Sequence, residues 1–162
     1  MGGLDLFGCL WLFFVYSFFG WIAETCFCVL KYRKFMNRGM LNSPLCIVYG
    51  IAAVIITIGF PELFDEIPIL FLGCAGVSTL LEWFTAKILE KLDHKKWWDY
   101  SSKRWNLDGY ICLQYSIVWG ILGVLSVKFV TPVLMKLYHM VPSFMMQIAL
   151  WALLGVLIVD IL

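Results

Sequence analysis

The sequence predicts an all-α membrane protein, a polytopic bundle of about five transmembrane helices. Of its 162 residues, 62% are hydrophobic and only 14% are charged. A soluble domain usually carries about 25% charged residues, because its surface has to face water. The mean hydropathy of +0.89 supports the same class. We therefore expect residues 1–162 to form one transmembrane domain of a multi-pass protein in the cell membrane.

Five apolar segments are long enough to cross the membrane, since a span needs about 20 mostly apolar residues. Charged or proline-containing breaks separate them, and the first lacks the basic start and the cleavage site of a signal peptide. We expect that first segment to be retained as a span. The predicted spans are 4–30, 43–60, 67–87, 109–130 and 142–162, the last two being separated by a short link at 131–141.

The basic residues predict the orientation. Four of the twelve lysines and arginines lie at 31–38 and six at 87–104. Two spans separate the corresponding loops, 31–42 and 88–108, so both loops lie on one side of the membrane. The positive-inside rule assigns that side to the cytoplasm. The N-terminus is then outside and the C-terminus is cytoplasmic.

Three acidic residues interrupt the apolar segments near their predicted cytoplasmic ends: Glu24, Glu82 and Asp160. Charges inside lipid are costly, so they normally face protein or water. Small residues at helical spacing beside the two glutamates predict that both point into the bundle. Two interpretations remain open. The acids form ion pairs that hold the loops, or they line a polar, cytoplasm-facing cavity that binds a cation, a proton or a polar substrate. The ion-pair partners would be Arg38, Lys87 and Arg104.

The segment WWDYSSKRWNLDGY at 97–110 is rich in aromatic residues. Its tryptophans and tyrosines, Trp98 and Tyr100 among them, are typical of a belt at headgroup depth. Asp99 and Asn106 are residue types that occupy turns and helix caps. The segment is therefore either an interfacial anchor or a re-entrant segment that closes a cavity, which needs protein or water to cover its backbone.

Asn37 and Arg38 begin a second structured loop, which leads into the span at 43–60. The planar guanidinium of Arg38 suits a carboxylate or an anionic group of a substrate. The candidate substrate- or ion-binding residues are Glu24, Asn37, Arg38, Glu82, Trp98, Asp99, Tyr100 and Asn106.

Four blocks of the chain form a pattern in a fixed order: YSFFGWIAE at 16–24, NRGMLNSPLCIVYG at 37–50, LEWFTAKILEK at 81–91 and WWDYSSKRWNLDGYICLQYSIVWG at 97–120. Together they resemble a known family of small polytopic bacterial membrane proteins, the ABC-transporter type IV or CmpB-like family. Ser43 and Cys46 depart from the glycine and proline expected in the second block. The resemblance implies a permease role and adds Tyr49 and Trp119 to the characteristic residues.

Other classes of function have little support in the sequence. The six cysteines show no metal-ligand spacing, no nucleophile has an evident base nearby, and we expect neither a cofactor nor an enzyme. A formal net charge of +1 gives no reason to expect a nucleic-acid partner.

The predicted function is a transporter or permease-like subunit with a polar, cytoplasm-facing cavity. There is no GxxxxGK[ST] loop, so an ATPase would be a separate subunit that docks on the basic loops. The alternative is a non-transporting membrane module that binds lipid or a partner membrane protein. The small residues of the fourth span, Gly120 and Gly123 among them, fit packing within the monomer and packing across a homodimer equally.

Overall fold

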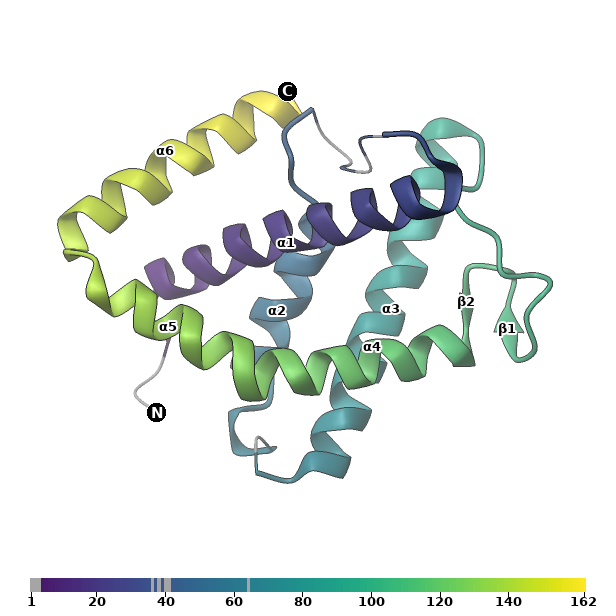
Figure 1. Ribbon diagram of the computed structural model, residues 1–162, viewed down its shortest axis with the longest axis horizontal. Helices are drawn as coiled ribbons and strands as arrows, with labels where there is room; N and C mark the ends of the chain where they lie inside the picture. The colour runs from purple at the N-terminus through teal and green to yellow at the C-terminus, as the bar shows by residue number, and fades with distance from the viewer. Residues whose placement is uncertain (1–3, 36, 38, 40–41, 64) are drawn as a thin grey trace. The chain divides into compact units, whose positions relative to one another are not determined.

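The computed structural model describes residues 4–35, 37, 39, 42–63 and 65–162 (Figure 1). Its α-helices confirm the all-α class, and its two short strands pair as one antiparallel hairpin. The helices are α1 (Leu6–Tyr32), α2 (Ile47–Gly59), α3 (Ile67–Asp93), α4 (Leu113–Leu125), α5 (Thr131–Met140) and α6 (Ser143–Ile161). The remaining elements are the 3-10 turn η1 (Pro61–Leu63), the π-helical turn η2 (Ser126–Val130), β1 (Asn106–Leu107) and β2 (Ile111–Cys112).

Among the described residues, four helices are long and apolar enough to cross a membrane: Leu6–Lys31, Ile67–Asp93, Leu113–Met140 and Ser143–Ile161. The predicted span at 43–60 contains α2, which has only 13 residues. At about 1.5 Å per residue, α2 is about 20 Å long.

Two helices extend beyond their predicted ends. α3 continues past residue 87 to Asp93, because the lysines in its last turns are good helix formers that a helix end accommodates. The helix that begins at Leu113 continues through η2 and α5, so the predicted link at 131–141 is helical as far as Met140. Pro132 is the second residue of α5 and lies two residues after the π-helical turn, where the backbone hydrogen-bond pattern already departs from the α-helical one.

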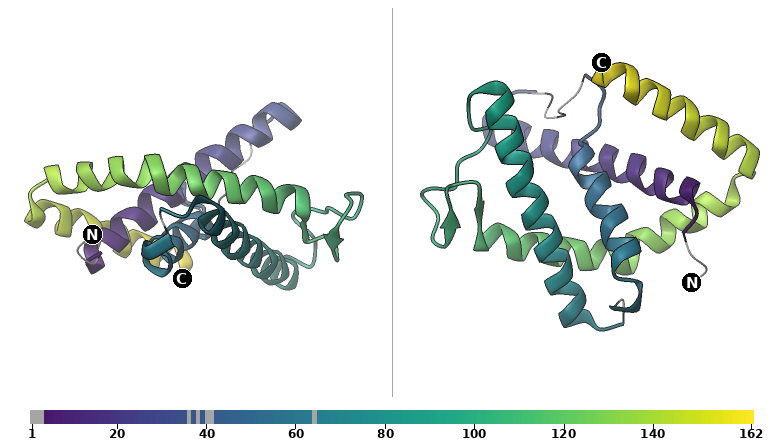
Figure 2. Two further views of the ribbon diagram at one scale, coloured as in Figure 1. Left: turned by 90° about the horizontal axis from the view of Figure 1, so that it is seen from below. Right: turned by 180° about the vertical axis from the view of Figure 1, so that it is seen from behind.

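The chain divides into two compact units, and each is described by itself. Unit 1 comprises residues 1–54 and 131–162. Its helix α1 contacts both α5 and α6, which leave their connection as two arms with α1 between them (Figures 1 and 2). Trp11 Nε1 donates to the Leu134 carbonyl at 3.0 Å. The core of this unit contains Phe14, Met146, Leu150 and Leu157.

Two glycines allow α1 and the start of α2 to approach each other closely in unit 1. A Cβ atom added to Gly20 would lie 2.7 Å from Tyr49 Cβ, and one added to Gly50 would lie 2.8 Å from Phe13 Cδ2. The chain before α2 also contacts α1, since the Cys46 N–H donates to the Ser17 carbonyl at 2.9 Å. This close packing fixes where Tyr49 can lie.

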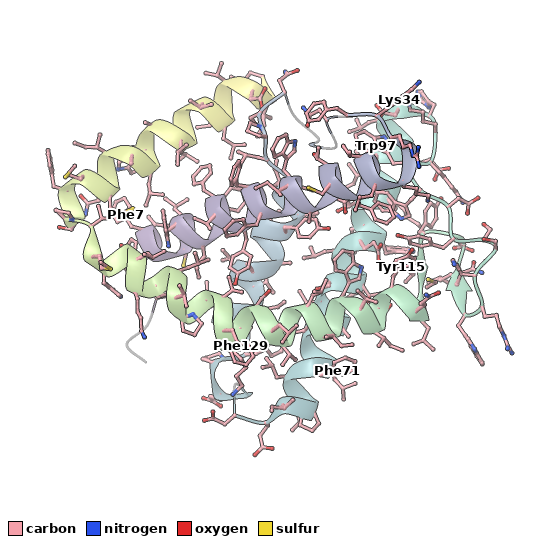
Figure 3. All side chains as sticks on the ribbon, in the orientation of Figure 1. Phe7, Lys34, Phe71, Trp97, Tyr115 and Phe129 are labelled. Atoms are coloured by element: carbon pink, nitrogen blue, oxygen red, sulfur yellow. The ribbon has the colours of Figure 1, made fainter. Side chains whose placement is uncertain are left out.

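Unit 2 comprises residues 55–130, and in it α3 crosses α4 (Figure 1). Gly120 faces the ring of Phe71, which is labelled in Figure 3, and a Cβ added to that glycine would lie 2.5 Å from Phe71 Cε2. Gly123 faces Cys74 in the same way, at 2.8 Å from its sulfur. These two small residues therefore pack within the chain, against α3.

Candidate functional site

Glu82 is the centre of a polar site in unit 2. It lies on α3, half-buried, and its two carboxylate oxygens accept hydrogen bonds from two other elements. Tyr100 Oη donates to Oε1 at 3.2 Å, and Trp119 Nε1, on α4, donates to Oε2 at 3.1 Å. Hydrogen bonds to an ionised acceptor are stronger than neutral ones. The carboxylate therefore links α3, α4 and the loop between them.

A second pair of polar side chains lies one helical turn away from Glu82. Thr79 Oγ1 donates to Ser116 Oγ at 2.8 Å, and Ser116 Oγ donates to the Cys112 carbonyl at 3.2 Å. Thr79 and Glu82 are three residues apart on α3, as Ser116 and Trp119 are on α4, so each pair lies on one helix face. These four residues form the polar seam, a row of hydrogen-bonded groups between two apolar helices.

The loop 94–112 holds Tyr100 in place. The Tyr100 ring stacks on the ring of Tyr115 of α4, which is labelled in Figure 3, at a centroid distance of 4.7 Å. The Tyr100 N–H donates to the Gly109 carbonyl at 2.8 Å, and Trp98 Nε1 donates to the Tyr110 carbonyl at 2.9 Å. The Asn106 side-chain amide donates to the Lys103 carbonyl at 2.7 Å. Trp98, Tyr100 and Asn106 therefore hold the loop together.

Asp99 is exposed and turned into its own loop. One of its oxygens accepts from the Ser101 N–H at 2.9 Å and from Ser101 Oγ at 2.5 Å. The side-chain and then the backbone donor of Ser101 lower the pKa of Asp99. Gly109 sits against this pair with φ +75°, and a Cβ added there would lie 2.5 Å from Ser101 Oγ. The predicted turn role of Asp99 is confirmed.

The side chains of two lysines lie near the ring of Tyr110. Lys96 Nζ lies 4.5 Å from the centre of the Tyr110 ring and Lys87 Nζ lies 5.9 Å from it, distances at which an aromatic face attracts a cation. Tyr110 Oη donates to Glu90 Oε2, and this hydrogen bond is the main cause of a raised pKa for Tyr110. The end of α3 is thus fastened to the loop by charge as well as by packing.

Glu24 forms a corresponding site in unit 1. Tyr49 Oη, on α2, donates to Glu24 Oε1 at 2.7 Å. One turn earlier on α1, Trp21 Nε1 donates to Asn37 Oδ1 at 2.7 Å, and the same oxygen accepts from the Gly39 N–H at 3.0 Å. Asn37 therefore fixes the start of its loop on α1. Arg38 lies outside the described residues.

Asp160 of α6 holds the end of that loop. Its Oδ1 accepts from the Asn42 N–H at 3.2 Å, and its Oδ2 accepts from the Ser43 N–H at 2.8 Å. The third predicted acid therefore binds backbone amides of the segment that leads to α2. Such amides need a partner wherever water is excluded.

The structure thus brings the candidate residues together in two groups. Glu82, Trp98, Tyr100 and Asn106 belong to the site of unit 2, with Asp99 at its edge, and Glu24 and Asn37 belong to that of unit 1. Two donors were not candidates from the residue chemistry alone, Tyr49 and Trp119, although both stand in the family-like blocks. Each of the two glutamates thus has an aromatic donor on another helix, whereas Asp160 accepts from backbone amides.

The four long apolar helices, with hydrogen-bonded carboxylates on three of them, define a multi-pass helical membrane protein. The chain belongs to the family described as "Putative ABC-transporter type IV", whose model matches residues 11–162. This match confirms the resemblance found in the sequence and supports a transporter-like role. No curated protein and no solved structure was found to match the chain.

Proposed function

We propose that this protein is a transporter or permease-like subunit of the cell membrane, in which Glu82 and Glu24 bind a cation or a polar substrate. Membership of an ABC-transporter family supports the transport role. The observation that carries the proposal is the site of Glu82, a carboxylate on a long apolar helix that is oriented by Tyr100 and Trp119.

Ionisable groups among apolar helices are expensive and mark ion or substrate pathways. Two of the donors to Glu82 are a phenol and an indole, and their hydrogen bonds fix the direction of its oxygens. An oriented negative charge favours a cation or a donor group of a substrate over an anion.

The proposed topology has five spans, with α2 as the short one, the N-terminus outside and the C-terminus in the cytoplasm. The basic residues at 31–38 and 87–104 then face the cytoplasm, as do the polar sites of Glu24 in unit 1 and of Glu82 in unit 2. An ATPase subunit would be a second chain that docks on these basic loops, because this sequence contains no phosphate-binding loop.

The test is a flux measurement on the full chain in proteoliposomes. Uptake of Na⁺, of Rb⁺ and of protons is followed for the wild type and for Glu82→Gln and Glu24→Gln, which keep size and polarity. The control is Glu62→Gln, in the exposed turn η1. We expect flux of at least one cation to fall about tenfold or more in the two glutamate variants, equivalent to about 1.4 kcal/mol, and to be unchanged in the control. Full flux in both variants with only a lower Tm would assign the carboxylates a structural role.

One observation favours the alternative, a non-transporting module that binds lipid. Trp105 is 76% exposed and Leu107 is 53% exposed, beside the exposed cations Lys103 and Arg104. Apolar and basic side chains together suit an anionic lipid surface. A wild type that transports none of the probes but retains anionic lipid on purification, and loses it in Trp105→Ala, would support this alternative.

A further inference from the structure

A pocket in unit 1 lies outside both glutamate sites. Its lining comes from α5, from the start of α6 and from the residues just before α1. Figure 1 shows the connection between α5 and α6. Its lining includes three thioethers, an imidazole, a phenol and a carboxylate, which are those of Met135, Met140, Met146, His139, Tyr138 and Asp5. Neither the flux proposal nor the family description assigns a role to these residues.

Two of these groups, a thioether and the imidazole, lie on one face of α5. Met135 and His139 are four residues apart, the spacing that places two side chains one above the other on a helix. The tip of Met135 reaches α1 at Gly8, since a Cβ added to that glycine would lie 3.6 Å from Met135 Cε and 2.8 Å from Asp5 Oδ1. The thioether therefore lies near the carboxylate as well.

The carboxylate of Asp5 is fixed by its surroundings. It caps α1 by accepting from the Gly8 N–H at 2.9 Å, and Tyr138 Oη donates to its Oδ2 at 3.2 Å. Met146 approaches from α6 and is only 5% exposed. Thioether and carboxylate groups from three helical segments therefore line one pocket around the α5 face.

The chemistry of these donors selects a particular class of ion. Thioethers are soft ligands that prefer Cu(I), and imidazole accepts the same metal, whereas Mg²⁺ and Ca²⁺ require oxygen ligands. In the described part of the chain, no three His, Cys, Asp or Glu residues form a group that could hold a metal. The lining of this pocket therefore does not fit an ion that requires several oxygen or thiolate ligands. Because thioethers and imidazole are neutral, the nearby Asp5 carboxylate supplies the balancing charge.

We propose that this pocket binds a soft monovalent metal ion, Cu⁺ or Ag⁺, through Met135, His139 and Met146. Core packing explains Met146, which belongs to the apolar cluster of unit 1. It does not explain why an exposed imidazole and a second thioether at helical spacing line the same pocket. Metal binding accounts for all three.

The experiment uses the purified full chain and Ag⁺, which is stable to oxidation, in competition with a chromogenic chelator. The wild type is compared with the double variant Met135→Leu/His139→Leu, since leucine is a good helix former of similar size. The matched control is Met145→Leu, in the first turn of α6 and outside the pocket lining. We expect the double variant to bind one Ag⁺ fewer, or to bind it at least tenfold more weakly, and the control to match the wild type.

Binding that all variants share belongs to the six cysteines and does not count for the pocket. An equal stoichiometry and affinity in the double variant would overturn the proposal, as would an equal loss in Met145→Leu. X-ray absorption of wild-type protein with one equivalent of Cu⁺ provides a test that needs no variant. Imidazole scattering together with sulfur is expected, and a shell of sulfur alone would assign the ion to cysteines and overturn the proposal.

Discussion

Replacing Gly20 by alanine tests the close contact that positions Tyr49 against Glu24. The added Cβ would lie 2.5 Å from Tyr49 Cδ2 and 2.7 Å from Tyr49 Cβ. Because these atoms lie at the base of the side chain, a change of rotamer at the far end of the ring does not relieve the clash. Either α2 moves away from α1 or Tyr49 leaves its position, and its 2.7 Å hydrogen bond to Glu24 is lost with it.

The expected cost follows from comparable overpacking. Extra carbon atoms in a well-packed interior destabilise a protein by about 1–3 kcal/mol. For a chain of this length, 1 kcal/mol lowers Tm by about 2–4 °C, so Gly20→Ala should lower Tm by about 2–12 °C. The measurement is thermal unfolding in detergent, followed by the fluorescence of the eight tryptophans.

Gly155→Ala is the matched control, because nothing lies within 4 Å of a Cβ added at that glycine of α6. It should leave Tm unchanged or raise it slightly, since alanine is the better helix former. A second variant, Gly20→Ala/Tyr49→Ala, removes the ring that the new methyl group meets. Its loss should be smaller than the sum of the two single losses by more than about 0.5 kcal/mol. Equal Tm values for Gly20→Ala and Gly155→Ala, or strict additivity in the double variant, would refute the proposed contact.

The carboxylate and the loop of unit 2 allow three more tests. Trp119→Phe and Tyr100→Phe each remove one donor to Glu82, and such hydrogen bonds contribute about 1.5–3 kcal/mol. We expect both variants to unfold at a lower Tm than Trp105→Phe, an exposed control in the same loop; equal Tm values would contradict this. Gly109→Ala puts a side chain at φ +75° and against Ser101. Trypsin should therefore cleave the loop faster in this variant than in the control Ser102→Ala, and equal rates would show that the loop tolerates a Cβ. The Ser101 donors lower the pKa of Asp99, so their contribution to stability is complete above about pH 4 and is lost as the pH falls through the lowered pKa. Hydrogen-exchange protection of the Ser101 amide, corrected for its intrinsic rate, should therefore fall between pH 5 and pH 2 in the wild type. An equal fall in Asp99→Asn would show that another group titrates.

The sequence predicts the all-α class because long apolar segments can be identified from the local sequence, without knowledge of what they pack against. It also singles out Glu82 itself, since a charge within an apolar run stands out. It does not predict the donors to that charge, because Tyr100 and Trp119 lie 18 and 37 residues away. Such a pairing depends on how α3 crosses α4, and no local pattern contains that information.

The predicted ends of the helices differ from the observed ends for a related reason. The position of Pro132 predicted a break, and the structure continues the helix because a π-helical turn precedes it. Lys91 was expected in the loop 88–108, yet it lies within α3. Lys87, the last residue of the predicted span, lies 4.0 Å from the centre of the Trp83 ring. A long side chain near a helix end keeps its charge at the membrane surface while its stem packs on the helix. Charge therefore locates the membrane surface better than it locates the end of a helix.

The length of α2 has a consequence for how the protein is made. A segment of 13 residues falls short of the hydrocarbon thickness of about 30 Å, so it enters lipid poorly by itself. The helix that it packs against, α1, is synthesised before it. In the folded protein the Ser17 carbonyl of α1 accepts from the Cys46 N–H, and Gly20 of α1 leaves room for Tyr49. We therefore expect the first helix to assist the insertion of the second. We expect residues 43–60 to insert inefficiently in a host protein and to insert well when residues 4–30 precede them.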